Sequence, residues 1–284
     1  MIFVGLGGAG CKIIKQFDDN QNDGVDHITI DVGSNKKDTK SFSHMNHIQL
    51  PKVKTMEEME KESPDFTDWI NEDKETTLVL AGSGLASGCL MKLIESIVHK
   101  DGLEIIYIRP DMEFLNKEEI LRERLVFKVL QELARSGSFK RLYLLDNKKI
   151  VDILPDINIE NYYDKINETI AFTFNMIKYA CESDDSIRSN LTEQKETCRI
   201  VSFGPVDFEK SQENLFFDLK TVREKQILYL LSQKTLKDKS LLNKISRQMK
   251  DFSDDGNISV SYKVIKNDEQ DQVFCLSSTS IIQD

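Results

Sequence analysis

The stretch Met1-Ile2-Phe3-Val4-Gly5-Leu6-Gly7-Gly8-Ala9-Gly10 runs from a short apolar segment directly into a glycine-rich turn. A second stretch has the same form, with apolar residues 77–80 followed by Ala81-Gly82-Ser83-Gly84-Leu85-Ala86-Ser87-Gly88. A strand that enters a helix through such a turn leaves unpaired backbone N–H groups at the helix N-terminus, where the helix dipole favours anions. One turn of this kind arises often by chance. Two of them in one α/β pattern predict a nucleotide whose phosphates are held from two sides.

Composition and charge are those of a globular protein with an acidic excess. Hydrophobic residues make up 39% of the 284 residues, which is enough for one large domain or two modest ones. The net charge of −10 argues against a general nucleic-acid-binding surface, although it leaves a local nucleotide site open. No segment approaches the ~20 apolar residues of a membrane span, and no basic leader precedes the first strand. We therefore expect a cytoplasmic protein.

Neither the cysteines nor the histidines are spaced like metal ligands. The 5 cysteines are scattered, which indicates reduced thiols rather than disulfides or a zinc site. His44 and His47 share a polar stretch, but such a pair in a loop is more often incidental than a metal site. We therefore expect no metal held by these side chains alone.

Apolar segments and helical patterns alternate through the first half of the chain. We expect strands at 1–4, 27–30, 77–80, 104–108 and 141–145, helices at 11–17 and after Gly88, and loops with short helices over 33–75. A further helix is predicted from an apolar series at helical spacing, Leu121, Leu125, Val129 and Leu133. This βαβ repetition predicts an α/β fold with a doubly wound parallel sheet, which binds ligands at the carboxyl ends of its strands.

The second half of the chain predicts a long helix followed by a smaller α/β part. We expect a loop over 182–196, helices near 219–231 and 241–249, and strands at 198–203, 258–265 and 273–278, with a hairpin turn at 267–270. The predicted organisation is a nucleotide-binding domain over 1–158, a central helix over 159–182 and a reduced C-terminal domain over 183–284.

The order of these features resembles the FtsZ/tubulin superfamily over nearly the whole chain. Residues 4–10 are similar to the first phosphate loop of FtsZ, and residues 81–88 occupy the place of the tubulin signature loop. Ile108-Arg109-Pro110 is similar to the Thr-Arg-Pro segment of FtsZ, residues 145–155 to its Pro-Asn-Asp-Lys stretch, and residues 162–168 to the start of its central helix. The resemblance implies a GTP or GDP site, with Mg²⁺ as companion ion, and head-to-tail self-association into protofilaments.

The resemblance also implies which residues contact the nucleotide. In the family an aromatic ring stacks on guanine and an Asn or Asp four residues later reads the base edge, positions held here by Tyr163 and Asn167. The full set of implied contacts is Gly5, Gly7, Gly8, Ala9, Gly10, Cys11, Lys12, Asp31, Gly82, Ser83, Gly84, Leu85, Ala86, Ser87, Gly88, Arg109, Glu113, Asn147, Tyr163 and Asn167. Each has an ordinary alternative: the glycines can simply permit tight turns, Asp31 can cap a helix, and Arg109 can form a salt bridge. Tyr163 and Asn167 can be packing residues on one helix face.

The second turn departs from the family pattern. Leu85, Ala86 and Leu90 replace glycines. A close approach of a ligand to the backbone, which is possible only where there is no Cβ atom, is therefore obstructed there. Ser87 keeps a hydroxyl that can bond a phosphate, and Lys12 adds a charge where FtsZ commonly has Asn.

The loop after the central helix departs further. In FtsZ this loop carries an Asn-x-Asp-x-x-Asp motif whose acids act on the nucleotide of the neighbouring subunit. The corresponding residues 183–196 form a shorter loop without that motif. Asp184, Asp185 and Glu193 are the candidate catalytic substitutes, although acids in an exposed loop are more often plain surface residues.

Three functions follow from these observations. The favoured one is a GTP-binding, tubulin/FtsZ-like protein that forms head-to-tail filaments and hydrolyses GTP slowly. The alternative is a non-hydrolysing relative that serves as a structural or regulatory module. An NAD(P)-binding Rossmann oxidoreductase is supported by Gly5-x-Gly7-x-x-Gly10 with Asp31 at the ribose-binding distance, but it needs neither the second turn nor the Tyr163/Asn167 helix.

The short C-terminal part lacks the linker and partner-binding peptide of bacterial division FtsZ, which favours a specialised plasmid- or phage-encoded relative acting in a host cytoplasm.

Overall fold

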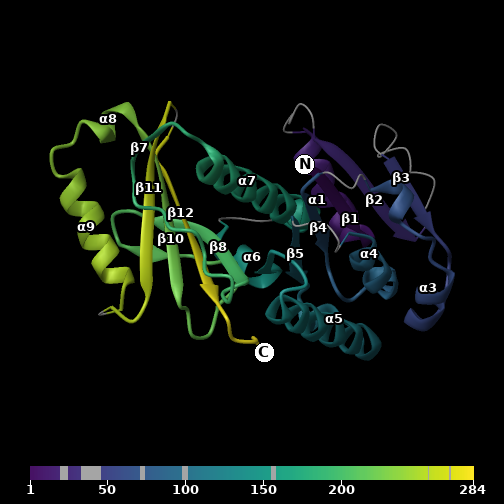
Figure 1. The fold of residues 1–284 in the computed structure, drawn as a ribbon. Helices are drawn as coiled ribbons and strands as arrows, with labels where there is room; N and C mark the ends of the chain where they lie inside the picture. Colours follow the sequence, from purple (N-terminus) through teal and green to yellow (C-terminus); the bar gives the residue numbers. More distant parts are fainter. Residues whose placement is uncertain are drawn as a thin grey trace. The chain divides into compact units, whose positions relative to one another are not determined.

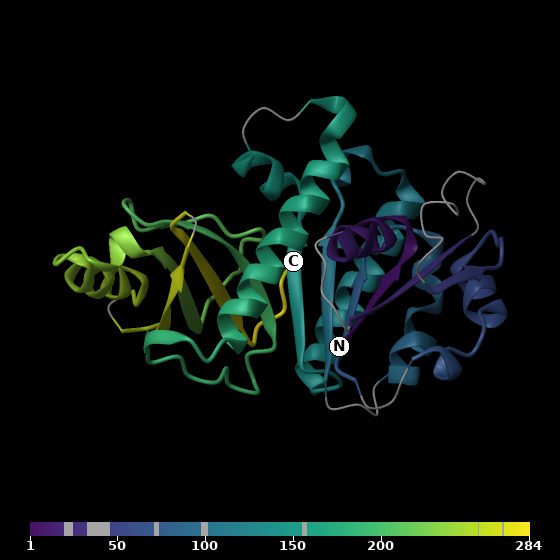
Figure 2. The same ribbon diagram turned by 90° about the horizontal axis from the view of Figure 1, so that it is seen from above.

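The computed structural model describes residues 1–19, 25–32, 46–70, 74–97, 102–154, 158–254, 256–268 and 270–284 (Figure 1). They divide into two units, residues 1–171 and 172–284. Each unit combines a sheet with helices, which confirms the predicted α/β class. The expected central helix is α7 (Tyr162–Glu182), a continuous helix that begins in the first unit and ends in the second (Figure 2).

The first unit is built on a parallel sheet in the strand order β3-β2-β1-β4-β5-β6. The strands are β1 (Ile2–Leu6), β2 (Asp26–Val32), β3 (Asn46–Leu50), β4 (Thr76–Leu80), β5 (Leu103–Arg109) and β6 (Arg141–Asp146). In the centre of this sheet, Gly5 of β1 lies opposite Thr29 of β2 and Val79 of β4. Because parallel strands all end at the same edge, the turns that follow them lie along one side of the unit.

The edge strand β3 corrects the expectation that residues 33–75 form only loops and short helices. β3 pairs in parallel with β2, and of its residues only Ile48 and Leu50 are buried. Its other residues are polar, so the segment lacks the continuous apolar run that marks the central strands. Residues 33–45 and 71–73 of the same expectation lie outside the described residues.

Helices and short 3-10 turns connect the strands of the first unit. They are α1 (Gly7–Asp19), α3 (Met56–Glu62), η1 (Thr67–Trp69), η2 (Leu85–Cys89), α4 (Leu90–Ile97), η3 (Met112–Phe114), α5 (Lys117–Ser136), α6 (Asn147–Ile153) and η4 (Ile159–Asn161). The ends of α5 are specified most fully by the sequence. Asn116 and Glu119 form a capping box at its start, and Gly137 ends it with a left-handed φ of 83°.

The predicted helix over residues 121–133 is therefore confirmed as α5, but its buried face differs from the predicted leucine series. The buried apolar side chains are Val126, Phe127, Leu130 and Ala134. Leu121 and Leu125 are 66% and 56% exposed. α5 thus carries a second apolar strip that is not part of the core.

The sheet of the second unit has the strand order β8-β12-β10-β11-β7, with β9 paired to β8. The strands are β7 (Ser186–Ser189), β8 (Ile200–Asp207), β9 (Gln212–Glu213), β10 (Glu224–Ser232), β11 (Ser259–Asn267) and β12 (Gln272–Thr279). β10 and β11 are parallel, and the other neighbours in this sheet are antiparallel. The helices are α8 (Gln233–Leu236) and α9 (Leu241–Phe252).

The helix α9 confirms the prediction at residues 241–249 and covers the core of the second unit. It buries Leu241, Ile245 and Phe252 in a cluster with Tyr229 of β10. The Tyr229 hydroxyl also donates to Oε1 of Gln248 on α9 at 2.6 Å. One polar pair thus accompanies the apolar contact and fixes the helix on the sheet.

Three predictions for the second unit are wrong. The helix expected at 219–231 is the buried strand β10, because a continuous apolar run has no period that separates a strand from a helix. The hairpin expected at 267–270 does not form, since β10 lies between β11 and β12. The loop expected over 182–196 contains β7, an exposed edge strand that pairs antiparallel with β11.

The contact of α1 with β4 gives a prediction about stability. A Cβ atom on Gly10 would overlap the carbonyl oxygen of Val79, whereas one on Gly8 would meet only Oδ2 of Asp31, at 3.9 Å. Gly10→Ala is therefore expected to lower the free energy of unfolding by about 3 kcal/mol, the cost of overpacking. Gly8→Ala is the matched control and should leave the free energy of unfolding unchanged. Urea denaturation measures both, and equal stability of the two variants would contradict the packing described for Gly10.

Candidate functional site

The two glycine turns lie side by side at the carboxyl edge of the first sheet. β1 and β4 pair in parallel with Leu6 opposite Leu80, so the turns that follow them leave the sheet at the same level. A Cβ atom built on Gly7 would lie 3.6 Å from the Cβ of Ala86. The structure thus brings together the two segments that the sequence singles out.

The glycines of the first turn have different reasons to be glycine. Gly7 adopts a φ of 74°, which an L-residue with a side chain rarely takes. A Cβ on Gly5 would lie 2.7 Å from the carbonyl group of Gly10, which itself packs on β4. Gly8 has no such constraint, and a Cβ there would meet only the Asp31 carboxylate at 3.9 Å. Internal packing therefore accounts for Gly5 and Gly10, and backbone conformation accounts for Gly7, which leaves the Gly8 face open.

The second turn shows the same division. A Cβ on Gly82 would lie 2.7 Å from the Tyr107 hydroxyl, and one on Gly88 would lie 2.7 Å from the Met56 carbonyl oxygen. A Cβ on Gly84 would meet no atom within 4 Å. Gly84 thus resembles Gly8 in having an open face that the packing of the described residues does not explain.

The residues that replace family glycines wind the second turn into the 3-10 helix η2. Ala86 and Ser87 are buried within it, and Leu85 is half-buried. The Ser87 hydroxyl lies 2.6 Å from the carbonyl oxygen of Gly84 and 3.1 Å from that of Gly82. Its hydrogen is therefore committed to the turn itself, and a Ser87–phosphate bond stays a prediction.

A buried polar network supports this turn from below. The Tyr107 hydroxyl and Nε of Arg109 both donate to Oε1 of Glu123, at 3.0 and 3.2 Å. The Glu123 side chain is fully buried, and the Arg109 guanidinium lies 4.3 Å from the centre of the Phe127 ring. Burial, with the charge of Glu123, raises the pKa of Tyr107 far above its usual range, so the phenol keeps its proton. Arg109 thus forms the salt bridge that the sequence allowed, and a nucleotide contact by Arg109 stays a prediction.

Sequence reasoning missed three residues that hold the second turn: Tyr107, Glu123 and Arg122. Nε of Arg122 donates to the carbonyl oxygen of Ser83 at 2.8 Å, while Tyr107 lies under Gly82. The available signal was weak. Glu123 falls on the same face of α5 as the buried Val126 and Leu130, and a carboxylate on an apolar face needs buried partners.

At the end of β6 the structure places Asp146, Asn147 and Lys148. Asp146 caps α6 by accepting from the Lys148 backbone N–H at 2.8 Å, and burial raises the pKa of its carboxyl group. Asn147 is 8% exposed, and its Oδ1 has no hydrogen-bond partner among the described residues. Glu113 is exposed and forms an ion pair of 2.6 Å with the Lys148 ammonium group. Of the predicted site residues here, Asn147 is the one with an unused polar atom.

The two residues predicted to read the base lie on the first turns of α7. Tyr163 is 54% exposed, and its ring meets that of Tyr162 edge-on with 5.0 Å between centroids. Asn167 is 6% exposed, and its side-chain amide forms no hydrogen bond with the described residues. An exposed ring and an unpaired amide on one helix face differ from ordinary packing residues, which would be covered and satisfied.

The remaining predicted contacts surround the start of α1. The buried thiol of Cys11 donates to the Gly5 carbonyl oxygen at 3.4 Å, and burial raises its pKa, so it remains protonated. Lys12 is exposed beside it. Asp31 is the penultimate residue of β2, where its Oδ1 accepts from the Val32 backbone N–H at 2.8 Å. It thus caps its own strand end while its other oxygen lies toward Gly8.

The candidate catalytic acids belong to the second unit. Asp184 and Asp185 precede β7 and Glu193 follows it, and all three are exposed. The start of this segment is held by Lys263 of β11, whose ammonium group donates to the Ser183 carbonyl oxygen at 2.6 Å. The acids therefore stand on a segment anchored to the sheet rather than in a free loop.

These features fit a phosphorylated ligand with a heteroaromatic base. Gly8 and Gly84 leave backbone accessible at two adjacent turns, and N–H groups at a helix N-terminus bind anions. Asn147 holds a buried amide oxygen without a partner, and the Asn167 amide forms no hydrogen bond with the described residues. Within the described part of the chain, no three His, Cys, Asp or Glu side chains are grouped to hold a metal ion.

Comparison with solved structures gives the class of fold. The model superposes on an FtsZ dimer from M. jannaschii with a TM-score of 0.69 at 12% identity, covering 98% of this chain and 87% of that one. It matches CetZ from Methanosaeta thermophila with a TM-score of 0.71 at 13% identity, over 99% and 86% of the two chains. A GTPγS-form protofilament of TubZ from Bacillus thuringiensis serovar israelensis gives 0.70 at 13% identity, again over 99% and 86%. The fold is FtsZ/tubulin-like, as the sequence resemblance implies.

Comparisons that use the sequence alone do not detect this likeness. No protein-family model matches it, and no curated protein gives a significant match. Among the described residues, no helix is both long enough and apolar enough to cross a bilayer.

Proposed function

We propose that this chain is a guanine-nucleotide-binding protein of the tubulin/FtsZ type that associates head to tail into filaments. The observation that carries the proposal is the pair of adjacent turns after β1 and β4, in which Gly8 and Gly84 alone have faces free of packing. A phosphate chain between them is the ligand that uses both helix N-termini and both open glycines. In this proposal residues 1–158 bind the nucleotide, 159–182 form the central helix and 183–284 form the C-terminal domain, and the protein acts in the cytoplasm.

Base recognition is proposed for the start of α7. The exposed Tyr163 ring offers a surface for stacking, and the Asn167 amide offers both a donor and an acceptor to the guanine edge. The free Oδ1 of Asn147 supplies a further acceptor near the end of β6. The Asn147 oxygen is buried without a partner among the described residues, so a ligand that donates to it recovers the cost of its burial.

Self-association is supported by the solved structures that share this fold. They include an FtsZ dimer and the two-stranded and four-stranded filaments of TubZ. We propose that Asp184, Asp185 or Glu193 of one subunit orients water at the nucleotide of the next. Mg²⁺, held mainly by phosphate oxygens and water, would neutralise phosphate charge there.

Two alternatives retain specific support. A non-hydrolysing relative fits the exposure of the three acids, which is ordinary for surface residues. An NAD(P)-dependent oxidoreductase fits the strand order of the first sheet and the position of Asp31 near Gly8. It gives no role to the open face at Gly84. The nucleotide retained by the purified protein, identified by chromatography after denaturation, separates the dinucleotide from the guanine nucleotide.

Phosphate binding is tested by Gly8→Val. The side chain would enter the open face of the first turn, and we expect GTP affinity to fall by at least about a hundredfold in calorimetry. The same substitution should leave the melting temperature near that of the wild type, because no described residue outside the local helix backbone lies closer than 3.9 Å to the new Cβ. Undiminished GTP affinity in a folded Gly8→Val protein would remove the basis of the proposed site.

Base choice is tested by Asn167→Ala. Loss of a buried hydrogen-bond partner costs about 1–3 kcal/mol, so the preference for GTP over ATP should narrow by about tenfold or more. Thr169→Ala, at a half-buried position of the same helix, is the control and should leave the preference unchanged. A wild-type protein that binds GTP and ATP equally would show that the base is not read at this position.

Hydrolysis is expected to be slow and to depend on assembly. A catalytic group supplied by a neighbouring subunit makes the activity per molecule rise with protein concentration, because only the assembled site is complete. Asp184→Ala or Asp185→Ala should lower this activity while GTP binding persists, as phosphate release and light scattering would record. Activity that is independent of concentration would place catalysis within one subunit, and bound GTP without turnover would favour the non-hydrolysing relative.

A further inference from the structure

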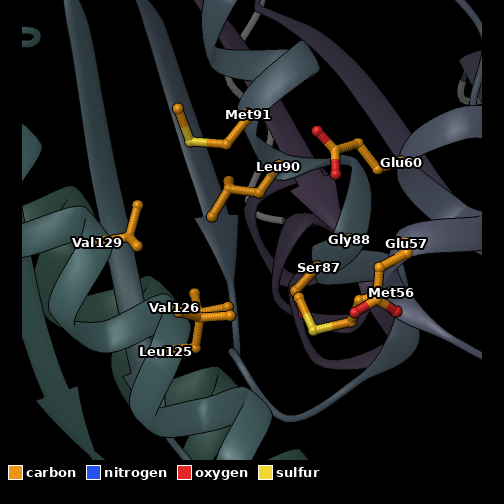
Figure 3. A pocket seen from close by; sticks show the side chains of 10 residues that line it. All are labelled: Met56, Glu57, Glu60, Ser87, Gly88, Leu90, Met91, Leu125, Val126 and Val129. Atoms are coloured by element: carbon orange, nitrogen blue, oxygen red, sulfur yellow. The ribbon is translucent and has the colours of Figure 1, made fainter.

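We infer that the first unit carries a docking groove for a basic amphipathic helix of a partner protein. The groove lies between α3, the second glycine turn, α4 and α5 (Figure 3). Its apolar lining consists of Met56, Leu90, Met91, Leu125, Val126 and Val129. Glu57 and Glu60 of α3 line the opposite side.

The apolar surface of the groove continues along α5 in a form that suits a helix. Leu121, Leu125, Val129 and Leu133 are spaced four residues apart, so they form a strip about 18 Å long. Leu121 and Leu125 are 66% and 56% exposed, and Met91 on α4 is 37% exposed. This length corresponds to several turns of an amphipathic helix and exceeds what a small ligand covers. Val129 and Leu133 are half-buried, so the exposed part of the strip is centred on Leu121 and Leu125, and exposed apolar residues grouped in this way mark interaction surfaces.

The charge beside the groove selects the chemistry of the partner. Neither Glu57 nor Glu60 forms an ion pair with the residues that the structure describes. Two nearby cations are engaged elsewhere, since the Lys92 ammonium group donates to the Ser63 carbonyl oxygen and Arg122 donates to Ser83. Arg124 and Lys128 of α5 are exposed but do not line the groove. No Lys or Arg lines the groove. Two unpaired carboxylates beside an apolar strip complement a helix with lysine or arginine flanking its apolar face.

The groove also touches the turn proposed to hold phosphate. Ser87 and Gly88 line it, and Gly88 packs so closely on α3 that a Cβ would lie 2.7 Å from the Met56 carbonyl oxygen. A helix in the groove would therefore contact α3 and η2 together. The groove itself is defined by α3, α4 and α5, and its occupancy can be measured without nucleotide.

The apolar part of the inference is tested with a labelled peptide of leucine and lysine, about five turns long, with leucines at i, i+4 and i+7. We expect saturable binding by fluorescence anisotropy, weakened at least tenfold by Leu125→Asp. Leu242→Asp is the matched control, because Leu242 is 52% exposed on α9 of the second unit. Unchanged peptide affinity after Leu125→Asp overturns the inference. So does a result in which Leu125→Asp changes the sedimentation coefficient of the protein but not its affinity for the peptide, because the groove would then be a contact between two copies of this chain.

The charge part is tested by reversing both acids. The double variant Glu57→Lys with Glu60→Lys should lower the affinity for the leucine–lysine peptide at least tenfold. It should also allow a leucine–glutamate peptide of the same spacing to bind. Glu160→Lys with Asp164→Lys reverses two other exposed acids and should do neither. These positions are exposed, so melting temperatures should match the wild type. Equal weakening by both double variants would mean attraction to general negative charge and would overturn the inference.

Discussion

The approach of α1 to β4 at Gly10 is the contact on which the arrangement of the first unit depends. The helix backbone lies directly against the carbonyl group of Val79, and Gly5 leaves room for Gly10 on the other side. Because β1 and β4 are neighbours, this contact holds the start of α1 beside the turn that follows β4. Gly7 and Ala86 then lie side by side. A side chain at Gly10 would move α1 away from β4 and separate the two turns. The turns therefore stay adjacent only because the residue at this contact has no side chain.

The fold could be predicted where buried strands read as apolar runs bounded by glycine or aspartate, as in β1, β4, β5 and β6. It could not be predicted for β3 and β7, because an edge strand is half exposed and its residues resemble a loop. β10 was mistaken for a helix since it is buried almost throughout and has no alternation. The hairpin failed for a topological reason: consecutive strands need not pair, and β10 inserts between β11 and β12.

The candidate site could be located from the sequence, but its residues could not be sorted. In a sequence, a glycine that avoids a clash cannot be distinguished from one that leaves space for a ligand. The structure makes this distinction, because a Cβ atom would clash at Gly10 and would not clash at Gly8. Similarly, a serine hydroxyl in a phosphate-type turn suggests a ligand contact, whereas the hydroxyl of Ser87 is directed at the carbonyl oxygens of Gly82 and Gly84. The role of the buried Glu123 on α5 was hard to predict because its partners, Tyr107 and Arg109, lie on a different element, the strand β5.

The winding of the second turn into η2 has a thermodynamic consequence. A flexible glycine loop loses backbone entropy when an anion orders it, and that loss is subtracted from the affinity. Here the Ser87 hydroxyl and the buried Ala86 already fix the turn. Leucine and alanine in place of glycine also restrict the unfolded chain. The ordering cost is therefore met once, when the protein folds, and an anion of the proposed kind would meet a turn that is already formed.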